Sequence, residues 1–218
     1  MLKKLLLAAG LWAASFQAWG HSVWIEPGQD GQLIIRFAEP DGKFEKSPGH
    51  LDEIETPAAW KTGDKGPVRL EVQKKADHFL IVGSKISDAV QIETQFGVLA
   101  APGKPGRLPH FYARWQPRGA GGAAPALQLD LVPTGKPGEF RVYFRGKPMP
   151  EAKATLRTPD EKEQALTADG DGVLRFSASG AGLYMLSLAH HREALPGFSR
   201  GQAYDVTSHN ASVTWVEP

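Results

Sequence analysis

Short stretches in which apolar and polar residues alternate recur along most of the chain. This two-residue period is typical of half-buried strands, and it appears at residues 33–37, 68–72, 78–82, 90–94 and 111–115. It returns at residues 127–132, 140–144, 152–157, 173–177, 182–188 and 212–216. Turn-forming residues separate the stretches at intervals of roughly 8–12 residues, as in antiparallel sandwiches. The pattern predicts an all-β protein with two antiparallel β-sandwich domains.

Interruptions of this pattern indicate where the chain divides. Residues 1–20 are an apolar leader, and residues 119–126, rich in glycine and alanine, have no apolar anchor. We therefore expect an N-terminal β domain at residues 21–118, a linker at 119–126 and a C-terminal β-sandwich at 127–218. Residues 43–66 are expected to be a long loop with one helical turn, in which His50 is mobile.

The leader has the features of an export signal. A basic start precedes an apolar run at residues 5–16, and Ala18 and Gly20 stand at the positions that signal peptidases accept. A twelve-residue run is too short to span a bilayer, which takes about 20 residues. Cleavage after Gly20 makes His21 the first residue, whose α-amine and imidazole can chelate one metal ion. Cleavage after Ala18 would leave His21 an ordinary near-terminal residue. We predict a periplasmic or secreted protein without membrane insertion after cleavage.

Composition narrows the chemistry further. The chain has no cysteine, so neither a disulfide framework nor a thiolate metal site is available. The 25 Lys and Arg residues, two of them in the leader, nearly balance the 24 Asp and Glu residues and form no cluster. This charge pattern argues against a nucleic-acid partner or a polybasic lipid contact. Any metal must therefore be held by nitrogen and oxygen, or by one of the few Met residues.

Seven histidines follow the leader and supply the candidate ligands. Neutral imidazole suits Cu(II), Ni(II) and Zn(II). His78 opens an apolar strand beside Asp77, which can orient its ring by a hydrogen bond. His209 lies in a polar stretch just before the last strand. The ligand set that we select is His21, His78, His191, His209 and, as the carboxylate at the end of the first strand, Glu39.

Adjacent histidines near the end of another strand need a separate argument. Because successive side chains in a strand point to opposite faces, only one of His190 and His191 can join a shared site. Glu193 follows and can either supply an oxygen ligand or orient a histidine. The Asp-Gly-Asp-Gly run at residues 169–172 lacks the remaining ligands of a calcium loop, and we interpret it as a hairpin turn.

The second half of the chain resembles the transthyretin-like sandwich that is also attached to carboxypeptidases. The resemblance rests on residues 146–148, 152–157, 169–176 and 182–188. With His21 and a first β domain that ends in Tyr112-Ala-Arg, residues 21–218 are similar to a periplasmic family related to accessory metal-binding components of nickel and cobalt uptake systems. The resemblance implies an exported metal-binding protein that is not an enzyme, with a membrane or outer-membrane metal transporter as partner.

The predicted function is therefore periplasmic binding of a divalent transition metal, copper or nickel and cobalt, in uptake or buffering. Two alternatives stay open. One is a metal-free sandwich that binds a protein or another ligand. The other is a copper oxidase acting on polysaccharide, since that class also begins with a metal-bound histidine.

Overall fold

The computed structural model describes residues 21–38 and 43–218. Within these residues the protein is all-β, and the one helical element is the single 3-10 turn η1 (His50–Asp52). None of its helical structure is long and apolar enough to cross a bilayer. The predicted fold class is thus confirmed at the level of an all-β protein.

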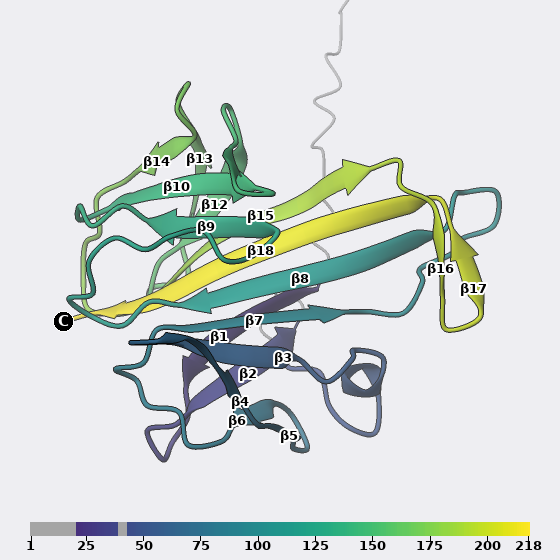
Figure 1. Ribbon diagram of the computed structural model, residues 1–218, viewed down its shortest axis with the longest axis horizontal. Helices are drawn as coiled ribbons and strands as arrows, with labels where there is room; N and C mark the ends of the chain where they lie inside the picture. The colour runs from purple at the N-terminus through teal and green to yellow at the C-terminus, as the bar shows by residue number, and fades with distance from the viewer. Residues whose placement is uncertain (1–20, 39–42) are drawn as a thin grey trace, which may run out of the picture.

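One large sheet runs through the molecule and joins both halves of the chain (Figure 1). Its strands, in spatial order, are β13 (Glu163–Thr167), β12 (Lys153–Arg157), β15 (Gly182–Glu193), β18 (Val206–Glu217), β8 (Arg107–Trp115), β7 (Val90–Gln95), β3 (Ala58–Gly63) and β4 (Gly66–Leu70). Neighbouring strands are antiparallel except for β18 and β8, which are parallel, with His209 opposite His110. The sheet is therefore mixed, which differs from the purely antiparallel architecture that the alternation predicts.

Smaller sheets complete the structure. The first contains β1 (Ser22–Pro27), β2 (Leu33–Ala38), β6 (Phe79–Ile81) and β5 (Val72–Lys74). The second contains β11 (Lys147–Pro148), β10 (Glu139–Phe144) and β14 (Val173–Arg175), with β9 (Leu129–Pro133) also paired to β10. A separate two-stranded ribbon consists of β16 (Gly197–Ser199) and β17 (Gln202–Tyr204).

The large sheet has a hydrophobic core on each face. Along β8, Tyr112 belongs to the core that includes β9, β10, β12 and β15, whereas Phe111 and Ala113 belong to the core that includes β1, β2 and β6. Alternate residues of one strand thus serve both cores. Strand β8 precedes residues 119–126 in the sequence and β18 follows them, and the two strands pair directly. The division into two sandwich domains at residues 119–126 therefore stays a prediction.

Strand β1, which follows His21, is attached to the large sheet by buried hydroxyl groups. Ser212 Oγ donates to the carbonyl of Val23 at 2.7 Å, and Thr214 Oγ1 donates to the carbonyl of Ile25. These bonds satisfy carbonyl oxygens that would otherwise be buried without a partner. They fix the strand that positions His21 over the edge of the core.

Residues 43–66, predicted as one loop, contain a strand. Strand β3 pairs with β7 along Ala58–Lys61 and with β4 along Ala59–Gly63. Its sequence, Ala-Ala-Trp-Lys-Thr-Gly, carries no apolar alternation because a small side chain, Ala59, provides its buried position. The connection between β2 and β3 therefore spans residues 39–57; its described part, residues 43–57, includes the η1 turn.

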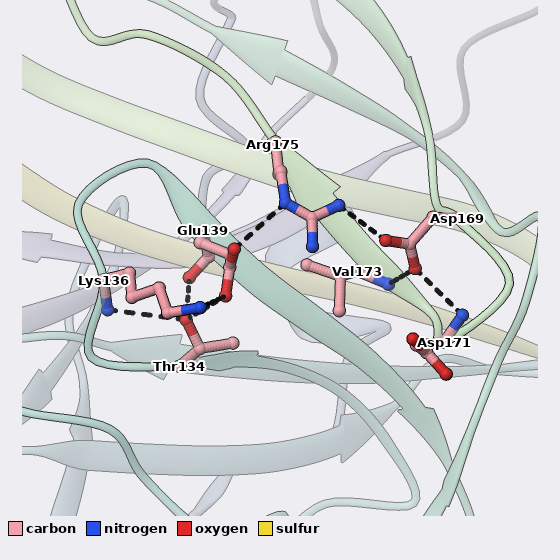
Figure 2. A network of polar contacts seen from close by, with 7 residues as sticks. All are labelled: Thr134, Lys136, Glu139, Asp169, Asp171, Val173 and Arg175. Atoms are coloured by element: carbon pink, nitrogen blue, oxygen red, sulfur yellow. Dashed lines mark hydrogen bonds and ion pairs between the residues drawn. The ribbon is translucent and has the colours of Figure 1, made fainter.

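The Asp-Gly-Asp-Gly run forms a turn, as predicted, although it is not a hairpin. Figure 2 shows the Asp169 carboxylate accepting hydrogen bonds from the backbone N–H groups of Asp171 and Val173 and from Arg175. Strands β13 and β14 on either side pair in different sheets. The Asp169 carboxylate therefore stabilises the turn in which the chain passes from the sheet of β13 to the sheet of β14.

Candidate metal centre

His21 lies directly before β1 and rests on aromatic side chains. Its ring stacks on Phe37 with centroids 4.7 Å apart and an interplanar angle of 27°. The ring of Phe96 also stacks with that of His21, with centroids 6.5 Å apart. Since β1 is fixed to β18 and Phe37 is buried in β2, the imidazole is held between the core and the surface.

Glu45 and His50 come from the connection between β2 and β3. The backbone N–H of Glu45 donates to the carbonyl of Phe37 at 2.9 Å, which places Glu45 beside His21. The turn at Gly49 requires glycine, because φ is +146° and a Cβ there would lie 2.9 Å from a backbone carbonyl. Leu51 next to His50 is fully buried and anchors the turn.

These three side chains point at one another. His21 Nε2 lies 2.5 Å from Glu45 Oε1, and His50 Nδ1 lies 3.4 Å from the same oxygen. One ligand atom from each residue lies within 4.8 Å of the other two. His21 and Glu45 are 25% and 18% exposed, whereas His50 is 64% exposed. The group is therefore seated in the protein on one side and accessible from solvent on the other.

The donor set is suited to a divalent transition metal. Ligand nitrogens and oxygens bind such ions at about 2.0–2.2 Å, so two ligands of one ion lie roughly 3–3.5 Å apart. The His50–Glu45 separation already matches this spacing, and the His21–Glu45 hydrogen bond has to open by less than about 1 Å. His21, Glu45 and His50 thus form a possible metal-binding group near the N-terminus of the described chain.

His78 occupies a different place. Its Nδ1 lies 2.7 Å from the Asp77 carboxylate, as the sequence predicts. That carboxylate also accepts from Arg36 Nη1 at 3.0 Å, and the His78 bond is the main reason that the pKa of Asp77 is lowered. His78 is therefore part of an ion-pair group and does not join the group around His21.

His191 and His209 are brought together on the opposite face of the large sheet. They are paired across β15 and β18, and their ring centroids are 6.1 Å apart. His209 is 1% exposed, with Nδ1 3.0 Å from the Tyr112 hydroxyl and Nε2 3.0 Å from Glu193 Oε2. Glu193 thus orients a histidine, one of the two roles predicted for it.

Burial affects the pKa of two histidines in this second group. Burial lowers the pKa of His209, and the hydrogen bond that its ring makes to the Glu193 carboxylate opposes that shift. His110, stacked 5.7 Å from His209, also has a pKa lowered by burial. The structure thus contains two histidine groups: the N-terminal group (His21, Glu45, His50) and the buried group (His110, His191, His209, with Tyr112 and Glu193).

Of the remaining predictions, Glu39 lies outside the described residues. The structure separates His190 from His191, as predicted, and His190 lines the pocket that also contains His21. Sequence reasoning selected neither Glu45 nor His50 as a ligand. The signal for them was weak: a carboxylate and a histidine five residues apart, in a segment without strand or helix periodicity.

Comparison of the sequence with protein-family models and with curated proteins finds no match.

Proposed function

We propose that the protein binds a divalent transition metal, copper or nickel and cobalt, at His21, Glu45 and His50. The convergence of three ligand atoms within 4.8 Å supports the proposal. Two imidazoles and one carboxylate match the ligand preferences of these ions, with copper bound most tightly in the Irving–Williams order. The role is uptake or buffering outside the cytoplasm, with a membrane metal transporter as the receiving partner, and it involves no catalysis.

The orientation of His21 favours coordination through Nε2. Within one histidine, the α-amine and Nδ1 can reach the same ion, but Nε2 lies on the far side of the ring. The group formed with Glu45 uses Nε2, so the amine chelate predicted from the sequence would place an ion away from Glu45 and His50. The proposed site therefore does not depend on a free amine, although export and cleavage after Gly20 remain part of the proposal.

Metal titration tests the site directly. Anaerobic calorimetric titration with Ni(II) and Cu(II) should show one site, and Glu45→Gln and His21→Ala should each weaken binding by more than about 100-fold, since even partners of metal ligands cost 10–100-fold. His78→Ala is the matched control and should leave the affinity unchanged. Equal affinities in all four proteins would refute the site.

An extension of the chain separates the two modes of coordination. Protein with one alanine added before a verified N-terminal His21 should keep its metal affinity within about twofold if Nε2 is the ligand. A loss of several kcal/mol, or more than about 100-fold, would instead support the amine chelate.

Both alternatives give distinct results. A metal-free binding module would show no heat with either ion. A copper oxidase would consume peroxide with ascorbate once loaded with copper, whereas a binding protein would not.

This proposal also includes the transthyretin-like character of residues 127–218 and the kinship with nickel and cobalt uptake proteins. The transthyretin-like character is supported by the arrangement of β9, β10 and β14 against β12, β15 and β18 around one core.

A further inference from the structure

The pocket beside the N-terminal group is small and mostly apolar. Its volume is about 200 Å³, below the roughly 300–1,000 Å³ of pockets for drug-sized molecules but several times the about 30 Å³ of one water. Its walls are aromatic and aliphatic side chains with a few polar groups among them. The lining includes His21, His50, Phe96, Arg107, His190 and Asn210. A molecule in this pocket would therefore contact metal ligands at one end.

Arg107 contributes an unusual charge to the pocket. It begins β8, is half-buried, and donates from Nη1 to Ser208 Oγ at 2.9 Å. No carboxylate of the described residues lies within ion-pair distance of it, and the nearby charge is the cation Arg192. A guanidinium stays charged even when burial lowers its pKa. Because a half-buried cation without a counterion is stabilised by contact with an anion, Arg107 favours an anionic ligand.

A β-bulge turns His190 into the same pocket. Leu188 is paired with Ala211 and His191 with His209, so Ala189 and His190 together oppose Asn210. Without the extra residue, His190 would lie on the face of Leu188, in the other core. Bulges that redirect a side chain are common beside functional sites.

The backbone at the bulge is also specialised. His190 has φ of +62°, a region that non-glycine residues seldom occupy, and its N–H donates to Asn210 Oδ1 at 3.0 Å. Nδ1 of His190 is enclosed and has no hydrogen-bond partner. An unpaired acceptor costs less than an unpaired donor, which favours the proton on Nε2. Burial and neighbouring arginines lower the pKa of His190, so the ring is a neutral N–H donor.

We propose that this pocket binds a small organic carboxylate that also coordinates the metal, so that the ion enters as a chelate rather than as a bare ion. The carboxylate contacts Arg107 and His190, and the metal end contacts His21, Glu45 and His50. A divalent ion held by one carboxylate keeps a positive charge, and Arg107 adds another, so an anionic chelator balances the pocket. This inference rests on the proposed metal-binding function.

A matched pair of chelators tests the inference. Ethylenediamine and 2,3-diaminopropionate both form a five-membered diamine chelate with Ni(II), and only the second carries a carboxylate. The 1:1 complexes are titrated into purified protein whose first residue is established by intact mass, and native mass spectrometry identifies the ternary species. We expect the diaminopropionate complex to bind about tenfold or more tightly than the ethylenediamine complex, the range for one charge-assisted hydrogen bond.

Two variants and one control assign the effect to the pocket. Arg107→Gln should abolish the preference for the carboxylate-bearing complex while leaving affinity for Ni(II) alone within about twofold. Arg107→Lys should keep part of the preference, which guards against a loss of fold. Arg69→Gln, an exposed arginine on β4, should change nothing.

The outcomes distinguish this inference from the proposed function. If Ni(II) alone binds with dependence on Glu45 but both complexes bind equally, the carboxylate site is wrong and the metal site stands. If the preference survives in Arg107→Gln, the inference is also overturned. If neither Ni(II) nor its complexes bind, the proposed metal function and the inference built on it both fail.

Discussion

The two histidine groups lie on opposite faces of one sheet and use the same residue types differently. In the N-terminal group, nitrogens of His21 and His50 converge on one carboxylate oxygen, and His50 is 64% exposed. In the buried group, both nitrogens of His209 already have partners, a hydroxyl and a carboxylate. The difference is one of exposure: an ion can reach the N-terminal group through the exposed His50, whereas His209 is 1% exposed and enclosed by aromatic rings.

The comparison also separates function from stability. Removing an exposed ligand should affect metal affinity and little else, because few packing contacts are lost. Removing His209 should affect folding, because its ring is packed between Tyr112 and Phe144. The predictions below test this separation, from the largest expected effect to the smallest.

The largest effect is expected on metal affinity. His50→Ala should weaken Ni(II) binding by more than about 100-fold, whereas His191→Ala should stay within about twofold. Calorimetric titration of both variants measures this. A similar loss in both would mean that the buried group takes part in binding, contrary to its geometry.

The second effect is on stability. His209→Ala should lower the free energy of unfolding by about 2–4 kcal/mol, since it leaves a cavity and removes two buried hydrogen bonds. His50→Ala should change it by less than about 0.5 kcal/mol. Denaturant unfolding of the metal-free proteins gives both values; equal destabilisation would contradict the contrast in burial.

The third effect is on the pH dependence of stability. The pKa of His209 is lowered from its usual 6.5 mainly by burial. Above pH 6.5 the histidine is neutral in both states; as pH falls below 6.5 the unfolded chain binds a proton that the folded protein excludes, so stability decreases until the folded pKa is reached.

Unfolding of the metal-free protein at pH 7.5 and pH 5.5 measures this loss. We expect it to be smaller in His209→Phe than in the wild type, although His110 and His190, whose pKa values are also lowered by burial, contribute the remainder. An identical loss in the variant would show that His209 does not couple folding to protonation.

The smallest effect concerns a single hydroxyl group. Tyr112→Phe removes the hydroxyl that lies 3.0 Å from His209 Nδ1 and donates to Gln128 Oε1 at 3.3 Å, and it should lower stability by about 1 kcal/mol, with metal affinity unchanged. Thermal unfolding monitored by circular dichroism is sufficient to detect it. A change in metal affinity instead would indicate communication across the sheet.

Much of the strand pattern could be predicted from local alternation, with clear limits. Residues 90–94 and 140–144 fall within β7 and β10 as observed. The parallel pairing of β18 with β8 could not be predicted, because alternation identifies a buried face but not a partner. We expected His209 in a polar segment just before the last strand, yet it lies within β18. There its ring nitrogens contact Tyr112 on β8 and Glu193 on β15.

For the candidate site, His21 was selected from its place after an export signal, and the structure includes it. Glu45 and His50 could not be selected, because their approach depends on a turn at Gly49 and on the contact of Glu45 with the backbone of Phe37. His78 and His209 were selected as well, but among the described residues only His21, Glu45 and His50 bring ligand atoms within 4.8 Å of one another.

The sequence by itself determined that the chain forms strands, that no thiolate is present and that histidine and carboxylate are the available ligands, because these follow from composition and local period. Tertiary structure alone decided which histidines converge. That choice depends on long-range pairing: β18 holds β1 and so positions His21, while the bulge opposite Asn210 decides which face His190 takes and which His191 takes. Nearest neighbours in sequence carry no information about contacts made across such distances.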